Sequence, residues 1–123
     1  MTSIAIDRTD GLSSATAVKG PCRCATTANI ALSGLQTIDG VVLVADDRVL
    51  VLAQTDATTN GVYVVAIGPW RRSPDFEGNR DVRKGTSVFV TDGTTLANQE
   101  YIVTTPNPVR IGTDNITLIQ KPT

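Results

Sequence analysis

Two cysteines separated by one residue are the most reactive side chains in this sequence. Cys22 and Cys24 flank Arg23. On an extended strand, residues two apart face the same side about 6.6 Å apart, whereas the Cβ atoms of a disulfide lie about 3.8 Å apart, so a bond between these two is geometrically poor. Three states remain open: free thiols that behave as small apolar side chains, inter-chain disulfides with a neighbouring subunit, and half of a metal site. We keep both residues as inter-subunit disulfide candidates and expect no metal.

Acid–base chemistry has few candidate residues. The sequence contains no histidine, which removes the commonest general base and the commonest transition-metal ligand. Asp75 and Glu77 form a pair of carboxylates of the kind used in glycoside hydrolysis, which needs two carboxyl groups at a defined separation beside a cleft. Nothing in the flanking sequence indicates burial, and several arginines lie nearby to pair with them. We therefore predict a solvated loop, no catalytic residue and no cofactor.

Five basic residues cluster around the same two carboxylates. Such a cluster is usually a solvated face, but in an assembly it can also contact an acidic surface of a neighbouring protein. Charges at an interface set docking and register more than affinity. The candidate interface residues are Arg71, Arg72, Arg80, Arg83 and Lys84.

The elements that position these residues are expected to be short strands. Valine and threonine are abundant, and β-branched side chains fit a pleated sheet better than a helical turn. Turn signals such as Asn60-Gly61 and Asp92-Gly93 separate the apolar runs. The expected strands are residues 41–44, 48–52, 61–67, 86–91, 99–105 and 115–120, with another beginning at residue 70, and residues 73–84 are a helical turn or an irregular loop. Seven or eight short strands at this spacing predict an all-β fold, a small sandwich or barrel.

The chain divides into an amino-terminal arm and one domain. Its 123 residues make one domain by length. Ile4 and Ile6 alternate with polar neighbours, but the rest of residues 1–20 is small, polar and without a period, and it ends at Gly20-Pro21. We assign residues 1–20 to an extended arm that contacts a neighbouring subunit through Ile4 and Ile6, with a self-packed arm as the alternative. Residues 21–123 are the β-domain.

Two aromatic residues are expected to anchor the core. Tyr63 shares one face of the strand predicted for residues 61–67 with Val65 and Ile67. The single tryptophan, Trp70, follows this strand and is expected to pack against one of its faces. The alternative for Trp70 is an exposed platform on which a sugar stacks.

One series of motifs resembles a known family. The chain carries LSGLQTIDGV at residues 32–41, DRVLV at 47–51, NGVYVV at 60–65 and then Trp70. In order and spacing these motifs resemble a small β-domain that recurs in bacteriophage tail-fibre and other virion proteins. Residues from about Ala25 to Arg72 match that family almost position for position, and the match continues more loosely to Gln120. Cys22 and Cys24 depart from the family, in which small or apolar residues usually stand at those positions.

The resemblance implies a non-enzymatic structural protein of a phage particle. We expect a tail-fibre, spike or collar-associated component of that particle, which mediates assembly or host attachment. The resemblance also implies a homotrimer, neighbouring virion proteins as partners, and a place on the particle exterior after synthesis in the host cytoplasm. The alternatives are a capsid decoration protein, which the single-domain length suits, and a glycan-binding module that recognises a host-surface sugar.

Charge and hydropathy argue against two other partner classes. The net charge is -1 and no long basic run is present, which argues against nucleic acid. No segment approaches the roughly 18 consecutive apolar residues that span a bilayer, so membrane insertion is not expected. The first residues also lack the charged-then-apolar pattern of a secretory signal.

Overall fold

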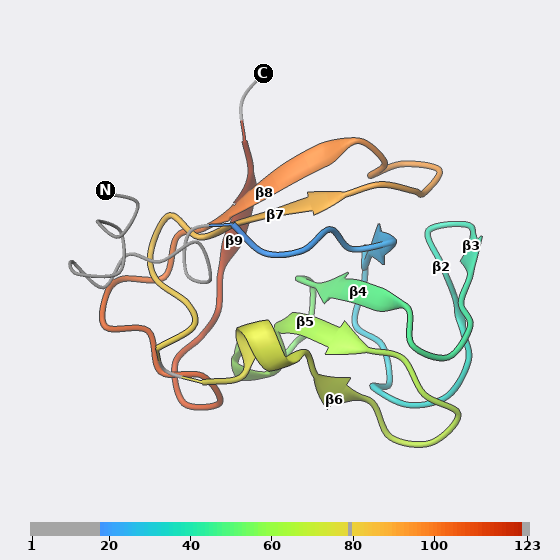
Figure 1. Cartoon of the computed structure of the whole chain (residues 1–123), viewed down its shortest axis with the longest axis horizontal. Helices are drawn as coiled ribbons and strands as arrows, with labels where there is room; N and C mark the ends of the chain where they lie inside the picture. Colours follow the sequence, from blue (N-terminus) through green and yellow to red (C-terminus); the bar gives the residue numbers. More distant parts are fainter. Residues whose placement is uncertain (1–17, 79, 122–123) are drawn as a thin grey trace, which may run out of the picture.

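The computed structural model describes residues 18–78 and 80–121, which form an all-β domain of the predicted class (Figure 1). Nine short strands make three sheets, whereas seven or eight strands were expected. The central sheet has the order β1-β4-β5-β6, with β1 (Cys24–Ala25), β4 (Arg48–Val51), β5 (Gly61–Val64) and β6 (Arg71–Arg72). A two-stranded ribbon pairs β2 (Thr37–Ile38) with β3 (Val41–Val42). The third sheet has the order β7-β8-β9, with β7 (Ser87–Val90), β8 (Gln99–Val103) and β9 (Leu118–Gln120).

The central sheet is the middle layer of a small sandwich. Because side chains alternate along a strand, β4 is buried on both faces. Its Leu50 packs with Val88 and Val103 of the third sheet, whereas Val49 packs with Ile38 and the rest of the ribbon's inner face. The core therefore consists of two clusters, one on each side of the central sheet.

The turn at Asp46 and Asp47 carries the chain between layers. The strands expected at residues 41–44 and 48–52 are both present, in shortened form, as β3 and β4. They do not pair with each other: β3 pairs with β2, and β4 pairs with β5 on one side and in parallel with β1 on the other. A positive φ of 76° at Asp46 accompanies this change of sheet.

The backbone of residues 18–26, here called the strap, links two of the three sheets. The strap first follows β7, where Lys19 N donates to Ser87 O at 2.9 Å and Cys22 N donates to Phe89 O at 2.8 Å. It then crosses to β4, with Thr26 N donating to Leu50 O at 3.0 Å. Residues 18–20, expected as the last part of a separate arm, thus already pack on the body. Ile4 and Ile6 lie outside the described residues.

The two aromatic anchors lie in the cluster beneath the ribbon, as expected. Trp70 is 7% exposed, and its indole N–H donates to Gly34 O at 2.9 Å. Tyr63 is also buried, and its hydroxyl donates to Thr59 O at 2.6 Å. Ile67, which the alternation placed beside Tyr63, is instead 79% exposed because β5 ends at Val64 and the chain turns away.

Candidate functional site

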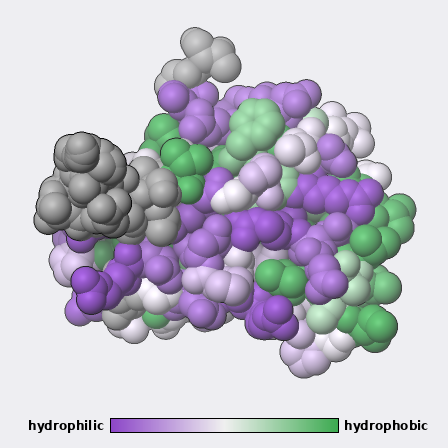
Figure 2. All heavy atoms as spheres, in the orientation of Figure 1, coloured by the Kyte–Doolittle hydropathy of each residue, from purple (hydrophilic) through white to green (hydrophobic). Residues whose placement is uncertain are grey.

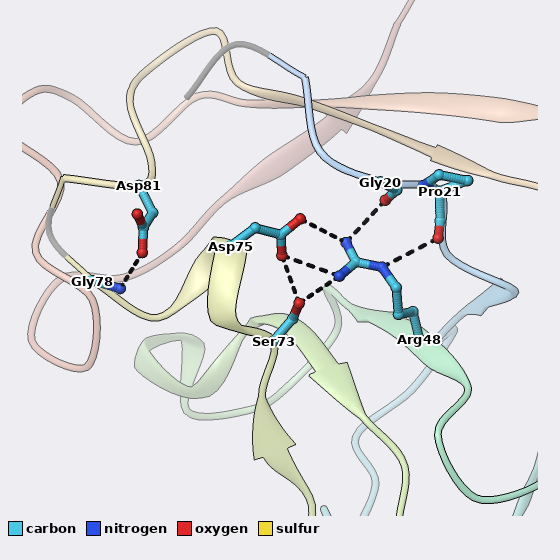
Figure 3. A network of polar contacts seen from close by, with 7 residues as sticks. All are labelled: Gly20, Pro21, Arg48, Ser73, Asp75, Gly78 and Asp81. Atoms are coloured by element: carbon cyan, nitrogen blue, oxygen red, sulfur yellow. Dashed lines mark hydrogen bonds and ion pairs between the residues drawn. The ribbon is translucent and has the colours of Figure 1, made fainter. Parts of the chain in front are cut away.

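A polar cluster fastens the strap to the central sheet. Arg48 begins β4, and its guanidinium reaches beyond the end of that strand to the strap (Figure 3). Its Nη2 donates to Gly20 O at 2.9 Å, and its Nε donates to Pro21 O at 3.3 Å. The same guanidinium faces Asp75, with Nη1 to Oδ1 at 3.1 Å and Nη2 to Oδ2 at 3.2 Å. We call these residues, together with Ser73, the Arg48 junction.

The short helical turn η2 (Pro74–Phe76) holds the carboxylate of this junction in place. Proline at its first position suits a helix start, and the Phe76 side chain is fully buried. Ser73 precedes the turn, accepts a hydrogen bond from Arg48 and donates to Asp75 Oδ1 at 2.6 Å. Burial alone would raise the pKa of Asp75, but the hydrogen bonds from Ser73 and Arg48 outweigh it and lower that pKa. The junction thus holds a charged pair whose side chains are 25% and 32% exposed.

Lys19 places a second cation beside the junction. The residue is 4% exposed, and its Nζ has no hydrogen-bond partner among the described residues. Burial lowers its pKa, while the charges of Asp75 and Asp81 act in the opposite direction. Asp81 itself accepts a hydrogen bond from Gly78 N at 2.8 Å (Figure 3). A buried ammonium without a partner is unfavourable, so Lys19 is a local cost to folding.

The two cysteines lie on opposite sides of the central sheet. Cys22 belongs to the cluster facing the third sheet and Cys24 to the cluster facing the ribbon. The expectation that they face the same side is therefore wrong, because the chain changes partner strand between them. Both are free thiols, 1% and 0% exposed. Burial raises the pKa of Cys22 to about 12 and that of Cys24 to about 11.

These facts bear on the expected inter-subunit disulfides. A disulfide forms by attack of a thiolate, and both thiols are protonated and enclosed in the core. No disulfide is seen, and forming one with another chain would require the strap to leave the core. The first of the three open states, buried free thiols, is the one that the structure shows.

Arg23, between the cysteines, provides a second attachment of the strap. Its Nη1 lies 2.7 Å from Asp47 Oδ2, and its Nε lies 3.6 Å from Asp92 Oδ2. Asp47 precedes β4 and Asp92 follows β7, and the same Nη1 donates to Val42 O of β3 at 3.2 Å, so this arginine connects all three sheets. The ion pairs and hydrogen bonds of this site attach the strap to the sheets, and its thiols are enclosed.

Arg72, predicted as an interface residue, has a structural role. Its Nη1 donates to Asn60 O at 2.9 Å and its Nη2 to Thr58 O at 2.8 Å, while the guanidinium lies 5.1 Å from the centre of the Tyr63 ring. These contacts are intramolecular and give Arg72 a role within the chain, whereas its interface role stays a prediction. The other four members of the predicted cluster are exposed: Arg71, Arg80, Arg83 and Lys84.

The carboxylates Asp75 and Glu77 do not form a pair beside a cleft. Asp75 binds Arg48, from a strand 27 residues earlier, instead of an arginine of its own segment, and Glu77 is exposed. An open cavity of about 380 Å³ lies elsewhere, lined by residues 105–108 with Arg110, Asp114 and Asn115. Neither these carboxylates nor Trp70 line it. Within the described part of the chain, no group of three or more metal-ligating side chains is placed to hold an ion.

Sequence reasoning missed most members of the site, among them Lys19, Arg48 and Ser73. One signal was present for Arg48: it is the charged residue at the start of the otherwise apolar run Val49, Leu50, Val51. A charge in that place either faces solvent or has a partner from another segment. The partner itself could not be found, because it depends on how distant segments pack.

Comparison with known proteins yields no relative. No protein-family model, no curated protein and no solved structure matches the chain. Over residues 18–78 and 80–121, no helix has the length and apolar character that crossing a membrane requires.

Proposed function

We propose that this chain is a non-enzymatic structural protein of a bacteriophage particle, and specifically a tail-fibre, spike or collar component. In this role its β-domain projects while the amino-terminal arm attaches it to neighbouring subunits. The observation that carries the proposal is the strap: the segment that continues the arm enters the core and is fastened to two sheets.

The motif residues behind the phage resemblance support the same role. Gly34, Asp39 and Gly40 adopt positive φ values, and the carbonyl of Gly34 accepts the indole hydrogen bond of Trp70. The carboxylate of Asp39 accepts hydrogen bonds from Thr95 N and Leu96 N. These positions shape turns and core contacts. The resemblance therefore concerns the scaffold of a module, which suits a structural protein better than an enzyme.

The geometry of the strap suits transmission of force. A pull on residue 18 acts along an extended segment that is hydrogen-bonded to β7 and then to β4. Arg48 also holds the carbonyl groups of Gly20 and Pro21, so several bonds must break together before the strap separates. An arm attached in this way can connect subunits without unfolding its own domain.

The test is a quantitative gel of purified phage particles, run with and without reductant. A band for this chain at a few per cent of the major capsid protein supports a tail or collar position. A ratio near one, or a simple fraction of it, would instead favour the capsid decoration alternative. Absence of the chain from particles would overturn the proposal. Because both thiols are buried, we expect a monomer band in both lanes, and a ladder that collapses with reductant would restore the inter-chain disulfides.

The glycan-binding alternative gains no support from the site. It required an exposed Trp70 or a cleft that joins Asp75 and Glu77. Trp70 is 7% exposed, and Asp75 is engaged with Arg48.

A further inference from the structure

The outer face of the β2–β3 ribbon is apolar. In the register of the ribbon, Thr37 lies opposite Val42, and the bond from Leu43 N to Gln36 O continues the ladder, which brings Leu35 opposite Val44. Leu35, Val42 and Val44 are 53%, 66% and 55% exposed. The solvent face of an antiparallel pair is normally polar. Three of the four side chains on this face are apolar, which is typical of a surface that binds a partner.

Ile67 extends this face beyond the ribbon. It lies in the turn after β5 and is 79% exposed, and this turn is joined to the ribbon side by the bond from Gly34 N to Gly68 O at 3.0 Å. Apolar side chains also gather at the right-hand end of Figure 2, where β2 and β3 lie in Figure 1. We call Leu35, Val42, Val44 and Ile67 the apolar ribbon face.

We propose that the apolar ribbon face binds the amino-terminal arm of a second copy of this chain, with Ile4 and Ile6 as the anchoring side chains. This inference rests on the proposed function, because it names the surface by which neighbouring subunits are attached. Residues 1–17 lie outside the described part of the chain, so this contact is inferred from their sequence alone.

The spacing of the apolar side chains fits one extended strand. Ile4 and Ile6 are two residues apart, so on a strand they face one side about 6.6 Å apart. The ribbon face has two rows of side chains, Leu35 with Val44 and Thr37 with Val42. The rows are also two residues apart along each strand, so the distance between them matches the distance between the two isoleucines. A two-stranded face is too narrow for the roughly 800 Å² per partner of a standard interface between two folded bodies. It matches the width of a single added segment.

The length of the arm allows binding between copies. In Figure 1 the strap begins on the side of the molecule away from the β2–β3 ribbon and runs towards it. Seventeen residues precede Val18 in the sequence and span at most roughly 56 Å when extended, against a radius of gyration of about 14 Å for a domain of this length. The arm can therefore reach the ribbon of an adjacent copy. Donor and acceptor surfaces differ, so the contact is head-to-tail and closes into a ring when the rotation permits, including the trimer expected for this protein.

Disulfide trapping between two different full-length variants tests the contact. One variant carries Ile6→Cys and the other carries Val44→Cys, and the two are mixed and mildly oxidised. We expect a reductant-sensitive heterodimer that forms several-fold faster than in the matched control, in which the partner carries Ile119→Cys. Ile119 is 53% exposed on β9, outside the apolar ribbon face. The native thiols are buried and stay silent.

Two results would overturn the inference. One is trapping with Val44→Cys that is no faster than trapping with Ile119→Cys. The other is a chain carrying both Ile6→Cys and Val44→Cys that closes on itself at every dilution while the mixed pair gives no heterodimer, which would place the arm on its own body.

A measurement of mass gives an independent readout. In the full-length chain, Val42→Thr with Val44→Thr keeps β-branched side chains in the ribbon but makes its outer face polar. We expect sedimentation velocity to show a smaller assembly for this variant and an unchanged assembly for Ile119→Thr, whereas an unchanged mass for the ribbon variant would contradict the inference. If the mass of the ribbon variant is unchanged but the chain is present in phage particles, the contact is wrong and the proposed function is intact. If the chain is absent from particles, the proposed function is wrong whatever the arm binds.

Discussion

Two regions of this domain, the start of the strap and the outer face of the ribbon, depart from the usual distribution of polar and apolar groups in opposite ways. At the strap, Lys19 is almost completely buried and Arg48 is mostly enclosed. At the ribbon, Val42 and Ile67 are 66% and 79% exposed. Buried charges seldom increase stability over apolar replacements, and exposed apolar clusters usually mark contacts. The buried charges therefore hold the fold of one chain together, whereas the exposed apolar side chains form the surface for which we proposed a contact between chains.

This comparison predicts a separation of energetic roles. Removing a partner from the Arg48 junction should affect folding, because the remaining charge stays in place without compensation. Changing the outer ribbon face should leave folding almost unaffected and alter association. The inner side of the ribbon belongs to the core and should behave like any core.

The largest effect is expected at the core beneath the ribbon. Trp70→Ala removes a buried indole and its hydrogen bond to Gly34, so we expect the free energy of unfolding to fall by about 3–5 kcal/mol in urea titrations followed by circular dichroism. Ile67→Ala is the matched exposed change and should stay within about 0.5 kcal/mol. A Trp70→Ala protein of normal stability that has lost sugar binding would contradict the core role and restore the glycan alternative.

The Arg48 junction should show the next largest effect. Arg48→Met leaves Asp75 without its cation and frees the carbonyl groups of Gly20 and Pro21. We expect a loss of about 2–3 kcal/mol in the free energy of unfolding, below the value for fully buried pairs because this pair is partly exposed. The exposed Arg83→Met is the control and should change little. An equal, small loss in both variants would mean that the junction does not fasten the strap.

Alkaline pH provides a third probe of the strap. The pKa values of Cys22 and Cys24 are raised to about 12 and about 11 from an ordinary value of 9.0, so above about pH 9 the unfolded chain loses protons that the folded chain keeps. Stability is therefore fully present below pH 9 and falls as the pH rises, by about 1–2 kcal/mol between about pH 9 and pH 10. Urea titrations at several pH values measure this slope, and Cys22→Ala should flatten it. An unchanged slope in Cys22→Ala would show that the thiol is not buried in solution.

The smallest effect should have the opposite sign. Lys19→Met removes a buried ammonium that has no hydrogen-bond partner in residues 18–78 and 80–121, so we expect a gain of about 1 kcal/mol in the free energy of unfolding, with the exposed Lys84→Met as control. The pKa of Lys19 is lowered by burial. Between this lowered pKa and the ordinary lysine pKa of 10.5, the free energy of unfolding therefore rises with pH. This rise should disappear in the variant. A loss of stability on Lys19→Met would show that the ammonium has a partner in solution.

Local pattern was sufficient to predict the fold class and the core. The abundance of valine and the alternation around Tyr63 predicted strands with one buried face, and Tyr63 and Trp70 lie in the core. These signals work because the two-residue period of a strand is a property of neighbouring residues alone. The same reasoning failed for Ile67, because the length of a strand depends on how many partner residues the sheet provides.

The partners of charged and sulfur-containing side chains could not be predicted in this way. Asp75 pairs with Arg48 of a distant strand, Arg72 packs on Tyr63, and the two cysteines lie on opposite sides of a sheet although one residue separates them. The positions of the cysteines depend on the strap changing from one sheet to the other, whereas the contacts of Arg72 and Asp75 depend on how β4, β5, β6 and the turn η2 pack together. The all-β class and the apolar core could be predicted from the residues alone, since they follow from local periodicity. The burial of particular charges, the enclosure of both thiols and the exposure of one apolar face emerged only from the folded structure, since they depend on contacts between segments far apart in the chain.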